Sequence, residues 1–435
     1  DASGRDASRP DAATPSACSL PAPMDQGVTY ERTLHVATSG TAGGDGSAAA
    51  PFDSIRSAAA VATPGTRILV AAGSYGSFYL ENLQGEPGRP IAIVADGDVT
   101  LDAAGSGTVV RMSDPAYLVF EGFTLANAGE HGMNIDDGGS YDSPAHHLVL
   151  RNITVPGAGS GGNNDCLKMS GVDDFWVLGA DISACNRGEA IDMVGCHRGV
   201  IAGNHFHDVV GNGVQAKGGS ADTLIHGNLF SDIPGRAVNA GGSTGLPYFR
   251  PMDAPYEAAN IRVIANVFER VGADSGAPVA YVGCDACSFA NNTIIEPLTW
   301  VARILQESTD ARFVPSREGL FVNNLVVLDT SVIRTFVNVG GNTAPETFVF
   351  ANNLWFATDR GAGWGGPTYS DGLPPEMDSV LQMDPLLVDR AGGDYHPMAG
   401  SPAAGVGRAL PFPQPPDFDG RCYADPPSAG AFELP

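Results

Sequence analysis

The sequence of 435 residues predicts an all-β solenoid of the parallel β-helix type, in which each coil of chain stacks on the coil before it. The first observation behind this prediction is a repeated motif in which a small residue or Asn precedes apolar or β-branched residues. It recurs at GFT (122), NIT (152), ADI (180), NHF (204), NLF (228), NVF (266), NTI (292), NLV (324) and NLW (353). The steps of 30, 28, 24, 24, 38, 26, 32 and 29 residues between these positions indicate a basal coil near 24 residues with insertions in loops.

The second observation is the composition of each repeat. Several short β-rich runs alternate with Gly, Asn and Asp, and a helical pattern is almost absent. Short strands of this kind stack into parallel sheets when each coil lies on its neighbour. We expect the recurrent Asn to stack at one turn, with its side chain hydrogen-bonded to neighbouring backbone.

The elements follow in order along the chain. Residues 1–30 are rich in Asp, Ala, Ser and Pro and predict a disordered spacer, because they hold almost no large apolar side chain. Residues 31–435 are predicted to form a single β-helix domain. It opens with an N-terminal helical cap over 31–75, which comprises a strand in LHVATSG, a helix in PFDSIRSAAAVATPG and a strand in TRILVAAGSY. IAIVADGDVTLDAAG predicts two more strands, and the longest step contains a loop insertion at 241–260.

Charge and hydropathy exclude two classes of function. The net charge of −25 argues against a nucleic-acid partner, which needs a basic face. No run of about 18 apolar residues occurs, so we expect no transmembrane segment. Of the seven cysteines, Cys284 and Cys287 form a lone C-x-x-C that favours a local disulfide or a pair of packed thiols over a metal site. The odd count leaves at least one thiol free or paired elsewhere.

The chain contains only two lysines, Lys168 and Lys217, among its 24 basic residues. A lysine can lose its proton when buried or crowded, whereas an arginine in practice cannot. Aligning HGMNIDDGG, NDCLKMSG, GEAIDMVG, GNGVQAKGG and PGRAVNAGG places five polar residues at one position of successive coils: Asp136, Lys168, Asp192, Gln215 and Asn239. Lys217 follows Gln215 by two residues and shares its face of the strand. A second column lies three residues earlier and contains Asp165, Glu189, Asn212 and Arg236.

Stacked coils would place Asp192 between the two lysines. Asp165, Glu189 and Asp192 would then converge as oxygen ligands for Ca²⁺. This combination suits β-elimination on a uronic acid polymer, in which a lysine with a lowered pKa removes a proton. The predicted catalytic residues are Lys217, Lys168, Arg236 and Arg250. The predicted substrate-binding residues are Asn239, Gln215, Tyr248, Tyr256 and His197, several of them on or beside the insertion, which we interpret as a substrate wall.

The pattern resembles the right-handed parallel β-helix superfamily of secreted carbohydrate-active proteins. The resemblance rests on residues 33–75 for the opening cap and on 384–407 and 417–433 for the closing runs. It implies a right-handed coil, export from the cell and a glycan partner.

The active face partly resembles two lyase families. In the Ca²⁺-dependent pectate lyase family, an Asp turn is followed by an acidic cluster one coil later and then by a lysine. The same order is present here in Asp165, then Glu189 with Asp192, and then GNGVQAK. The departure is that Gln215 stands where that family has its lysine. In the chondroitinase B and alginate lyase family, an arginine follows the lysine by one coil. Lys217 fits that lysine, but Ala240 falls near the arginine position and leaves Arg236 or Arg250 to serve.

Three functions stay open at this point. The leading prediction is a polysaccharide lyase that acts on an acidic glycan, secreted or tethered to the cell surface and monomeric. A glycoside hydrolase could use paired carboxylates among Asp165, Glu189 and Asp192. A surface adhesin or glycan-binding repeat protein would use the lysines only as structural ion pairs.

Overall fold

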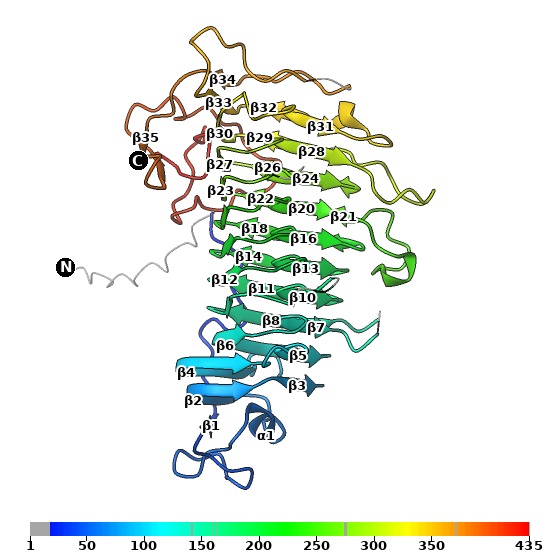
Figure 1. Cartoon of the computed structure of the whole chain (residues 1–435), viewed down its shortest axis with the longest axis vertical. Helices are drawn as coiled ribbons and strands as arrows, with labels where there is room; N and C mark the ends of the chain where they lie inside the picture. The colour runs from blue at the N-terminus through cyan, green and yellow to red at the C-terminus, as the bar shows by residue number, and fades with distance from the viewer. Residues whose placement is uncertain are drawn as a thin grey trace, which may run out of the picture.

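The computed structural model describes residues 18–140, 142–159, 161, 163–273, 276–369 and 372–434. Within them the chain forms a right-handed parallel β-helix, as predicted, with its coils stacked along one long axis (Figure 1). All strand pairs between coils are parallel, and the only antiparallel strand pair among the described residues is β35 (Leu387–Asp389) with β36 (Asp394–Pro397).

The largest sheet, of 21 strands, divides into two ladders. The first ladder contains β1 (Arg32–Val36), β2 (Thr66–Gly76), β4 (Ile91–Asp102), β6 (Ala116–Ala126), β8 (Ala145–Arg151), β11 (Val172–Leu178), β14 (Val200–Ala202), β18 (Leu224–His226), β22 (Arg262–Ile264), β26 (Ser288–Ala290), β29 (Leu320–Val322) and β32 (Val349–Ala351). The second ladder continues from β6 through β9 (Thr154–Val155), β12 (Asp181–Ser183), β15 (His205–His207), β19 (Leu229–Ser231), β23 (Val267–Glu269), β27 (Thr293–Ile295), β30 (Leu325–Leu328), β33 (Leu354–Ala357) and β34 (Val380–Leu381).

The remaining strands form a ten-stranded sheet that carries the candidate site and a short ladder at one corner. The ten-stranded sheet contains β3 (Phe78–Glu81), β5 (Val110–Ser113), β7 (Met133–Asp136), β10 (Leu167–Ser170), β13 (Ile191–Val194), β16 (Val214–Lys217), β20 (Val238–Gly241), β24 (Val279–Val282), β28 (Ala302–Leu305) and β31 (Val337–Val339). The corner ladder contains β17 (Ser220–Ala221), β21 (Ala258–Ala259) and β25 (Cys284–Asp285).

The N-terminal cap contains the predicted helix, α1 (Ile55–Ala59), which begins at Ser54 because the Ser54 side chain accepts a hydrogen bond from the Ser57 amide. Two details differ from the prediction. The two strands expected in 91–105 are one long strand, β4, whose pairing with β6 shifts register between Val94 and Val99. The other helical elements are two short 3₁₀ turns, η1 (Leu246–Tyr248) and η2 (Pro345–Thr347).

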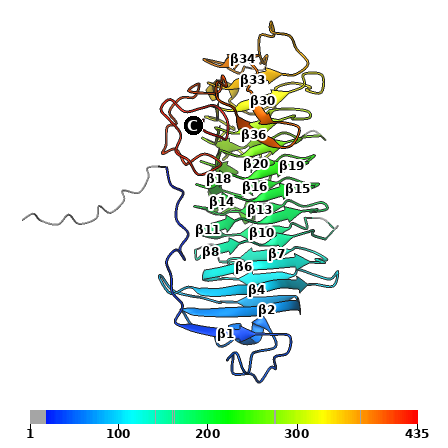
Figure 2. The ribbon, with the colours of Figure 1, turned by 90° about the vertical axis from the view of Figure 1, so that its left-hand side faces the viewer.

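The structure corrects part of the predicted spacer. Residues 1–17 lie outside the described residues, but residues 18–30 run along the outside of the first ladder (Figure 2). Met24 and Tyr30 pack against a small apolar cluster on that ladder, and Asp25 forms an ion pair with Arg151 at 2.9 Å. The composition of this segment predicted disorder because it has too few large apolar side chains to form a core of its own. Residues 18–30 are ordered by single contacts with the coil instead.

The recurrent asparagine forms a buried ladder, as predicted. Its members are Asn204, Asn228, Asn266, Asn292, Asn324 and Asn353. The Oδ1 atom of each Asn after the first accepts hydrogen bonds from the backbone and side-chain N–H groups of the Asn one coil before it, at 2.7–3.2 Å. Each turn is therefore fixed to the next by a polar column in the protein interior.

The first coils depart from this register. Asp181 pairs with Thr154, so the residue in line with Ala180 is Ile153 and not the predicted Asn152. Asn152 instead has a positive φ of 51°, a conformation that Asn tolerates better than most residues. The sequence therefore does not distinguish an Asn that stacks in the ladder from an Asn that only adopts a turn conformation.

The apolar core lies between the sheets and includes a stack of aromatic rings. Phe206, Phe230, Phe268, Phe289, Phe321 and Phe350 are fully buried, with successive ring centroids 4.9–5.6 Å apart. Repetition of one ring per coil extends the same packing along the axis, as expected for a solenoid.

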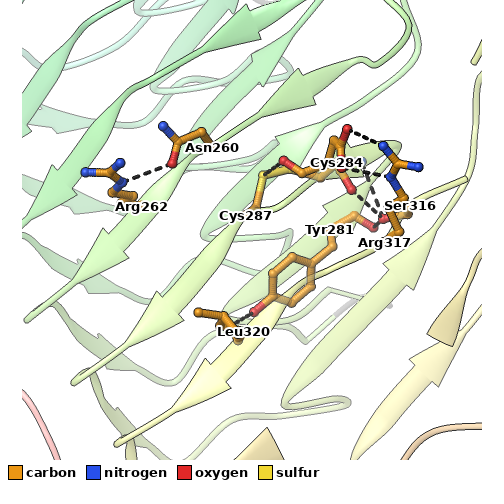
Figure 3. The surroundings of a disulfide bond; sticks show 9 residues. Asn260, Arg262, Tyr281, Cys284, Cys287, Ser316, Arg317 and Leu320 are labelled. Atoms are coloured by element: carbon orange, nitrogen blue, oxygen red, sulfur yellow. Dashed lines mark hydrogen bonds and ion pairs between the residues drawn. A yellow bond between two sulfur atoms is a disulfide. The ribbon is translucent and has the colours of Figure 1, made fainter. Parts of the chain in front are cut away.

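The cysteines form three disulfides, Cys18–Cys422, Cys166–Cys185 and Cys284–Cys287, and leave Cys196 as a buried thiol. The predicted local disulfide of the C-x-x-C motif is therefore confirmed. Figure 3 shows it next to β24, where the hydroxyl of Tyr281 donates to the Leu320 carbonyl at 2.6 Å. Among the described residues, none of the helices has the length and apolar character to cross a membrane.

Candidate active site

The outward face of the ten-stranded sheet carries a column of polar residues. Register pairs place Asn134, Lys168, Asp192, Gln215 and Asn239 next to one another on five successive strands. The four residues from Lys168 to Asn239 align as predicted. These side chains point outward because the apolar residues between them point into the core.

The predicted position of Asp136 in this column is wrong. Leu167 pairs with Met133, so Asn134 lies beside Lys168 and Asp136 lies beside Ser170. Met133 and Ile135 are both fully buried. Alternation along a strand has a period of two residues, so the apolar pattern alone fits either register.

Both lysines of the chain contact the same buried carboxylate. The Nζ atom of Lys168 donates to Oδ2 of Asp192, and Nζ of Lys217 lies 3.2 Å from Oδ1 of Asp192. Asp192 is only 1% exposed. The Lys168 ammonium also lies 3.5 Å from Oδ2 of Asp165. The predicted convergence of the two ammonium groups with the acids is therefore present in the structure.

Burial and charge act in opposite directions on these groups. Burial by itself would raise the pKa of Asp192, but Lys168 and Lys217 outweigh it and lower that pKa. Burial by itself would lower the pKa of Lys168, but Asp192 and Asp165 outweigh it and raise that pKa. Lys168 therefore stays a cation near neutral pH. The expectation of a lysine with a lowered pKa is not met at Lys168.

Glu189 completes the acidic cluster from the neighbouring turn. Its backbone amide donates to Oδ1 of Asp165 at 3.0 Å, and Nδ2 of Asn212 donates to its Oε1 at 3.0 Å. Burial raises the pKa of Glu189 to about 8, and Asp165 and Asp192 act in the same direction. Glu189 therefore keeps its proton at neutral pH and adds no negative charge to the cluster.

The cluster fits a hard cation. One oxygen from each of Asp165, Glu189 and Asp192 lies within 4.8 Å of the others. The buried Oδ2 atom of Asp165 accepts no hydrogen bond, which is unusual for a buried carboxylate. A donor set made only of carboxylate oxygens is the set that Ca²⁺ prefers. These three residues would hold the ion after Glu189 has given up its proton.

A pocket of about 580 Å³ opens beside the lysines. Lys168 and Lys217 line it from the coil, and Tyr248 and Arg250 line it from the insertion at 241–260. The insertion projects from the coil beside β21 (Figure 1). The insertion therefore lies next to the lysines, and its role as a substrate wall stays a prediction.

Two buried acids fasten the insertion to the coil. The guanidinium of Arg250 donates to both oxygens of Asp173 at 2.6 and 3.0 Å and to the Gly195 carbonyl at 3.0 Å. Glu257 accepts from the backbone amides of Gly218 and Thr244, both at 2.9 Å. Arg250 thus reaches the pocket with its charge already paired to Asp173.

Two residues predicted to bind substrate, Gln215 and Asn239, form a chain of hydrogen bonds with Arg236, which was predicted to be catalytic. Gln215 donates to Asp192 at 3.1 Å, and Asn239 donates to Gln215 at 2.7 Å. Arg236 donates to Asn239 at 2.9 Å and also to Glu307 at 2.9 Å. Arg236 is not among the residues that line the pocket. This chain of contacts fixes the orientation of the Asp192 carboxylate.

His197 and Tyr256 are not among the residues that line the pocket. One ring nitrogen of His197 lies 3.0 Å from Asp173 and the other lies 3.0 Å from the Gly219 carbonyl. Both polar atoms of this imidazole are thus engaged under the insertion. Tyr256 lines no part of the pocket, and burial raises its pKa.

The arginine position expected next to Lys217 holds a small residue. Ala240 pairs with Ala216 and is buried, and the strand that follows β16 supplies no arginine there. The column is interrupted at the buried Ala280, which pairs with Asn239, and a polar residue returns on the strand after it. Arg303 lies in register with Ala280 and stacks over the ring of Trp300 at 4.2 Å. The motif alignment missed it because the insertion interrupts the regular step.

No family model matches the sequence, and no curated protein matches it. Among solved structures, the chain is similar to pectate lyase Pel9A, with a TM-score of 0.57 and 16% identity over 95% of this chain and 99% of that chain. It is also similar to XylC in complex with xylose, with a TM-score of 0.51 and 11% identity over 93% and 98% of the two chains. A GH136 lacto-N-biosidase from Eubacterium ramulus matches with a TM-score of 0.48 and 14% identity over 81% and 68%. At these identities the likeness to the first two structures shows the fold, which is the right-handed parallel β-helix.

Proposed function

We propose that this protein is a polysaccharide lyase that cleaves an acidic, uronate-containing glycan by β-elimination. The observation that carries the proposal is the meeting of the only two lysines of the chain on one buried carboxylate, beside a pocket walled by the insertion. The likeness of the fold to a pectate lyase agrees with it. The overall charge of −25 does not oppose an anionic substrate, because attraction at the site depends on the local cations.

The two lysines take different roles in this proposal. Lys168 remains an ammonium and binds the carboxylate of the substrate. Lys217, as the uncharged amine, accepts the proton from the carbon next to that carboxylate and becomes an ammonium. The electron pair of the broken C–H bond forms a carbon–carbon double bond while the bond to the glycosidic oxygen breaks, and the leaving oxygen takes a proton from solvent.

The acidic cluster suggests a metal-assisted version of this reaction. When bound by Asp165, Glu189 and Asp192, Ca²⁺ would supply positive charge that stabilises the substrate carboxylate as the neighbouring carbon loses its proton. Glu189 would release its proton to serve as a ligand, and Gln215 and Asn239 would hold Asp192 in place. Thermal unfolding with EDTA and with Ca²⁺ tests this assignment, since a ligand that binds only the folded chain raises the melting temperature.

Product analysis tests the reaction class. Incubation with pectate, alginate, chondroitin or hyaluronan should produce the ultraviolet absorbance of an unsaturated uronate. Lys217→Ala should lose at least about a hundredfold in turnover, in line with the usual contribution of a general base. Lys217→Arg is the matched variant, because arginine also has a long side chain but in practice never loses its proton and cannot act as a base, and it should be equally impaired. Near-normal turnover of either variant would exclude Lys217 as the base.

A glycoside hydrolase is the second candidate, and Glu189 is the observation that favours it. A protonated Glu189 next to an ionised Asp192 is the pairing that a hydrolase uses as acid and partner carboxylate. The near-complete burial of Asp192 beneath the side chains of both lysines argues against direct contact with a sugar. Release of reducing ends without ultraviolet absorbance would identify a hydrolase, and neither signal would leave a glycan-binding protein.

We also propose that the protein works outside the cytoplasm, either secreted or at the cell surface. Three disulfides support this placement, because such bonds form and persist in oxidising compartments.

A further inference from the structure

A second cluster of ligating side chains lies on the second ladder, on a different sheet from the lysine pocket. Asp181 of β12 pairs in register with His205 of β15, and His207 follows His205 by two residues. The residues between them, Ile182 and Phe206, are fully buried. Asp181, His205 and His207 therefore point outward on one face.

Three potential ligand atoms converge in this cluster. The Nδ1 atom of His205 lies 3.5 Å from Oδ2 of Asp181, and Nε2 of His207 lies 3.4 Å from Oδ1 of Asp181. Both distances exceed those of a firm hydrogen bond between nitrogen and oxygen. The ligand atoms of all three residues lie within 4.8 Å of one another. The three groups thus surround a common point instead of bonding tightly to each other.

The remaining ring nitrogens have partners of their own. The Nδ1 atom of His207 lies 2.8 Å from Oδ2 of Asp208, and Nε2 of His205 lies 3.0 Å from Oγ of Ser231. A carboxylate on the far nitrogen of an imidazole is the usual support for a metal-bound histidine, because it fixes the tautomer and the ring orientation. When Nδ1 of His207 carries its proton toward Asp208, Nε2 presents a lone pair toward Asp181.

We propose that Asp181, His205 and His207 form a surface site for a first-row divalent transition metal, with Zn²⁺ as its representative. Two imidazoles and one carboxylate are ligands that Zn²⁺ binds, and three protein ligands leave a coordination position open to solvent. Asp208 and Ser231 position the two imidazoles. The site is independent of the lysine pocket and of the reaction proposed for it.

His396 shows what distinguishes this cluster from an ordinary ion pair. It also lies between two acids, Asp394 at 2.6 Å and Asp419 at 3.0 Å, but they contact opposite nitrogens of its ring. The donor atoms around His396 therefore do not converge on one point. This difference makes His396→Gln a matched control for the substitutions at the proposed site.

The test is a calorimetric titration of the full chain with ZnCl₂, with excess Ca²⁺ present so that the acidic cluster at Asp165 does not contribute. We expect saturable binding of one Zn²⁺ per chain, and a visible absorption spectrum with Co²⁺. His205→Ala and His207→Ala should each weaken binding by at least about tenfold and abolish the Co²⁺ spectrum. Asp208→Asn should weaken binding about tenfold through loss of the outer partner. His396→Gln should bind Zn²⁺ like the unaltered chain.

The proposal would be overturned if the chain showed no saturable Zn²⁺ binding, or if His207→Ala bound Zn²⁺ as tightly as the unaltered chain. The cluster would then be an ion pair of Asp181 with protonated histidines. Far-ultraviolet circular dichroism establishes that each variant is folded before titration. Crystals soaked in Zn²⁺ give an independent measurement, because the proposal requires an anomalous peak between Asp181 and the two imidazoles.

Discussion

Glu189 is a buried acid whose ionisation would lower the stability of the folded chain. Its pKa is raised from 4.5 to about 8, first by burial and then by Asp165 and Asp192. Because the pKa of Glu189 is higher in the folded chain than in the unfolded chain, its protonated form stabilises the fold. This contribution to the free energy of unfolding is complete below the pKa of the unfolded chain and is lost as the pH rises through the pKa of the folded chain. In the presence of a chelator, the melting temperature should therefore fall by a few degrees between about pH 5 and pH 8.

Glu189→Gln is the variant that isolates this effect. Glutamine cannot ionise, so the part of the pH dependence that comes from residue 189 should disappear, and the melting curves should change less between pH 5 and pH 8. Differential scanning calorimetry across that range provides the measurement. An unchanged pH dependence in the variant would mean that Glu189 is not the titrating group.

Much of the site could be predicted from residue types alone. The scarcity of lysine singled out Lys168 and Lys217, and the spacing of the motifs placed Asp192 beside both. The sequence could not show whether burial or neighbouring charge decides the direction in which each pKa shifts. Lys168 keeps its proton because two carboxylates outweigh its burial, and that outcome depends on distances between coils. The pairing of Arg250 with Asp173, 77 residues away along the chain, is likewise invisible before folding.

The ion pair of Arg250 with Asp173 is one of the contacts that hold the insertion on the coil. Asp173→Asn should release Arg250 and loosen the segment around Tyr248, which is already exposed. The loss of a charge-assisted bond of about 1.5–3 kcal/mol corresponds to at least about a tenfold larger open population. Chymotrypsin should therefore cut at Tyr248 about tenfold faster.

Asp174→Asn is the matched control, because Asp174 bonds Arg198 and not Arg250. It should leave the cleavage rate at Tyr248 unchanged. Equal cleavage of both variants would mean that Asp173 does not hold the insertion.

The asparagine ladder is an element that the sequence predicted from Asn204 onward and that links each coil to the next. Asn266→Ala removes the acceptor for two N–H groups of Asn228 in the interior. Buried groups left without partners cost about 1–3 kcal/mol each, so the substitution should lower stability by about 2–4 kcal/mol. Thermal unfolding should show a clear drop, whereas Asn163→Ala, at an exposed position, should have little effect. A small effect at Asn266 would show that the coil can repack without the ladder.

At the scale of the whole molecule, the sequence repeat predicted the stacked coils but not the way in which the two chain ends pack on them. The steps between motifs come from strands that each contact only their neighbours, so local spacing carries the information. The chain ends follow no repeat. Residues 18–30 pack on the first ladder, while a C-terminal segment that includes Tyr395 and Phe432 packs on the second (Figure 2). Contacts between such distant segments leave no periodic signal in the sequence.

Cys18 and Cys422 join these two segments across 404 residues. A disulfide stabilises mainly by restricting the unfolded chain, and more so when the closed loop is long, so this bond should contribute about 2–5 kcal/mol. Cys284–Cys287, with a separation of 3 residues, offers a matched comparison within the same chain. The double substitution Cys18→Ser/Cys422→Ser should lower the melting temperature by a few degrees, and Cys284→Ser/Cys287→Ser should lower it less. Both variants should retain activity at room temperature, because neither bond touches the lysine pocket. An equal loss of stability in the two variants would mean that the ends are held by their packing and that the length of the closed loop contributes little.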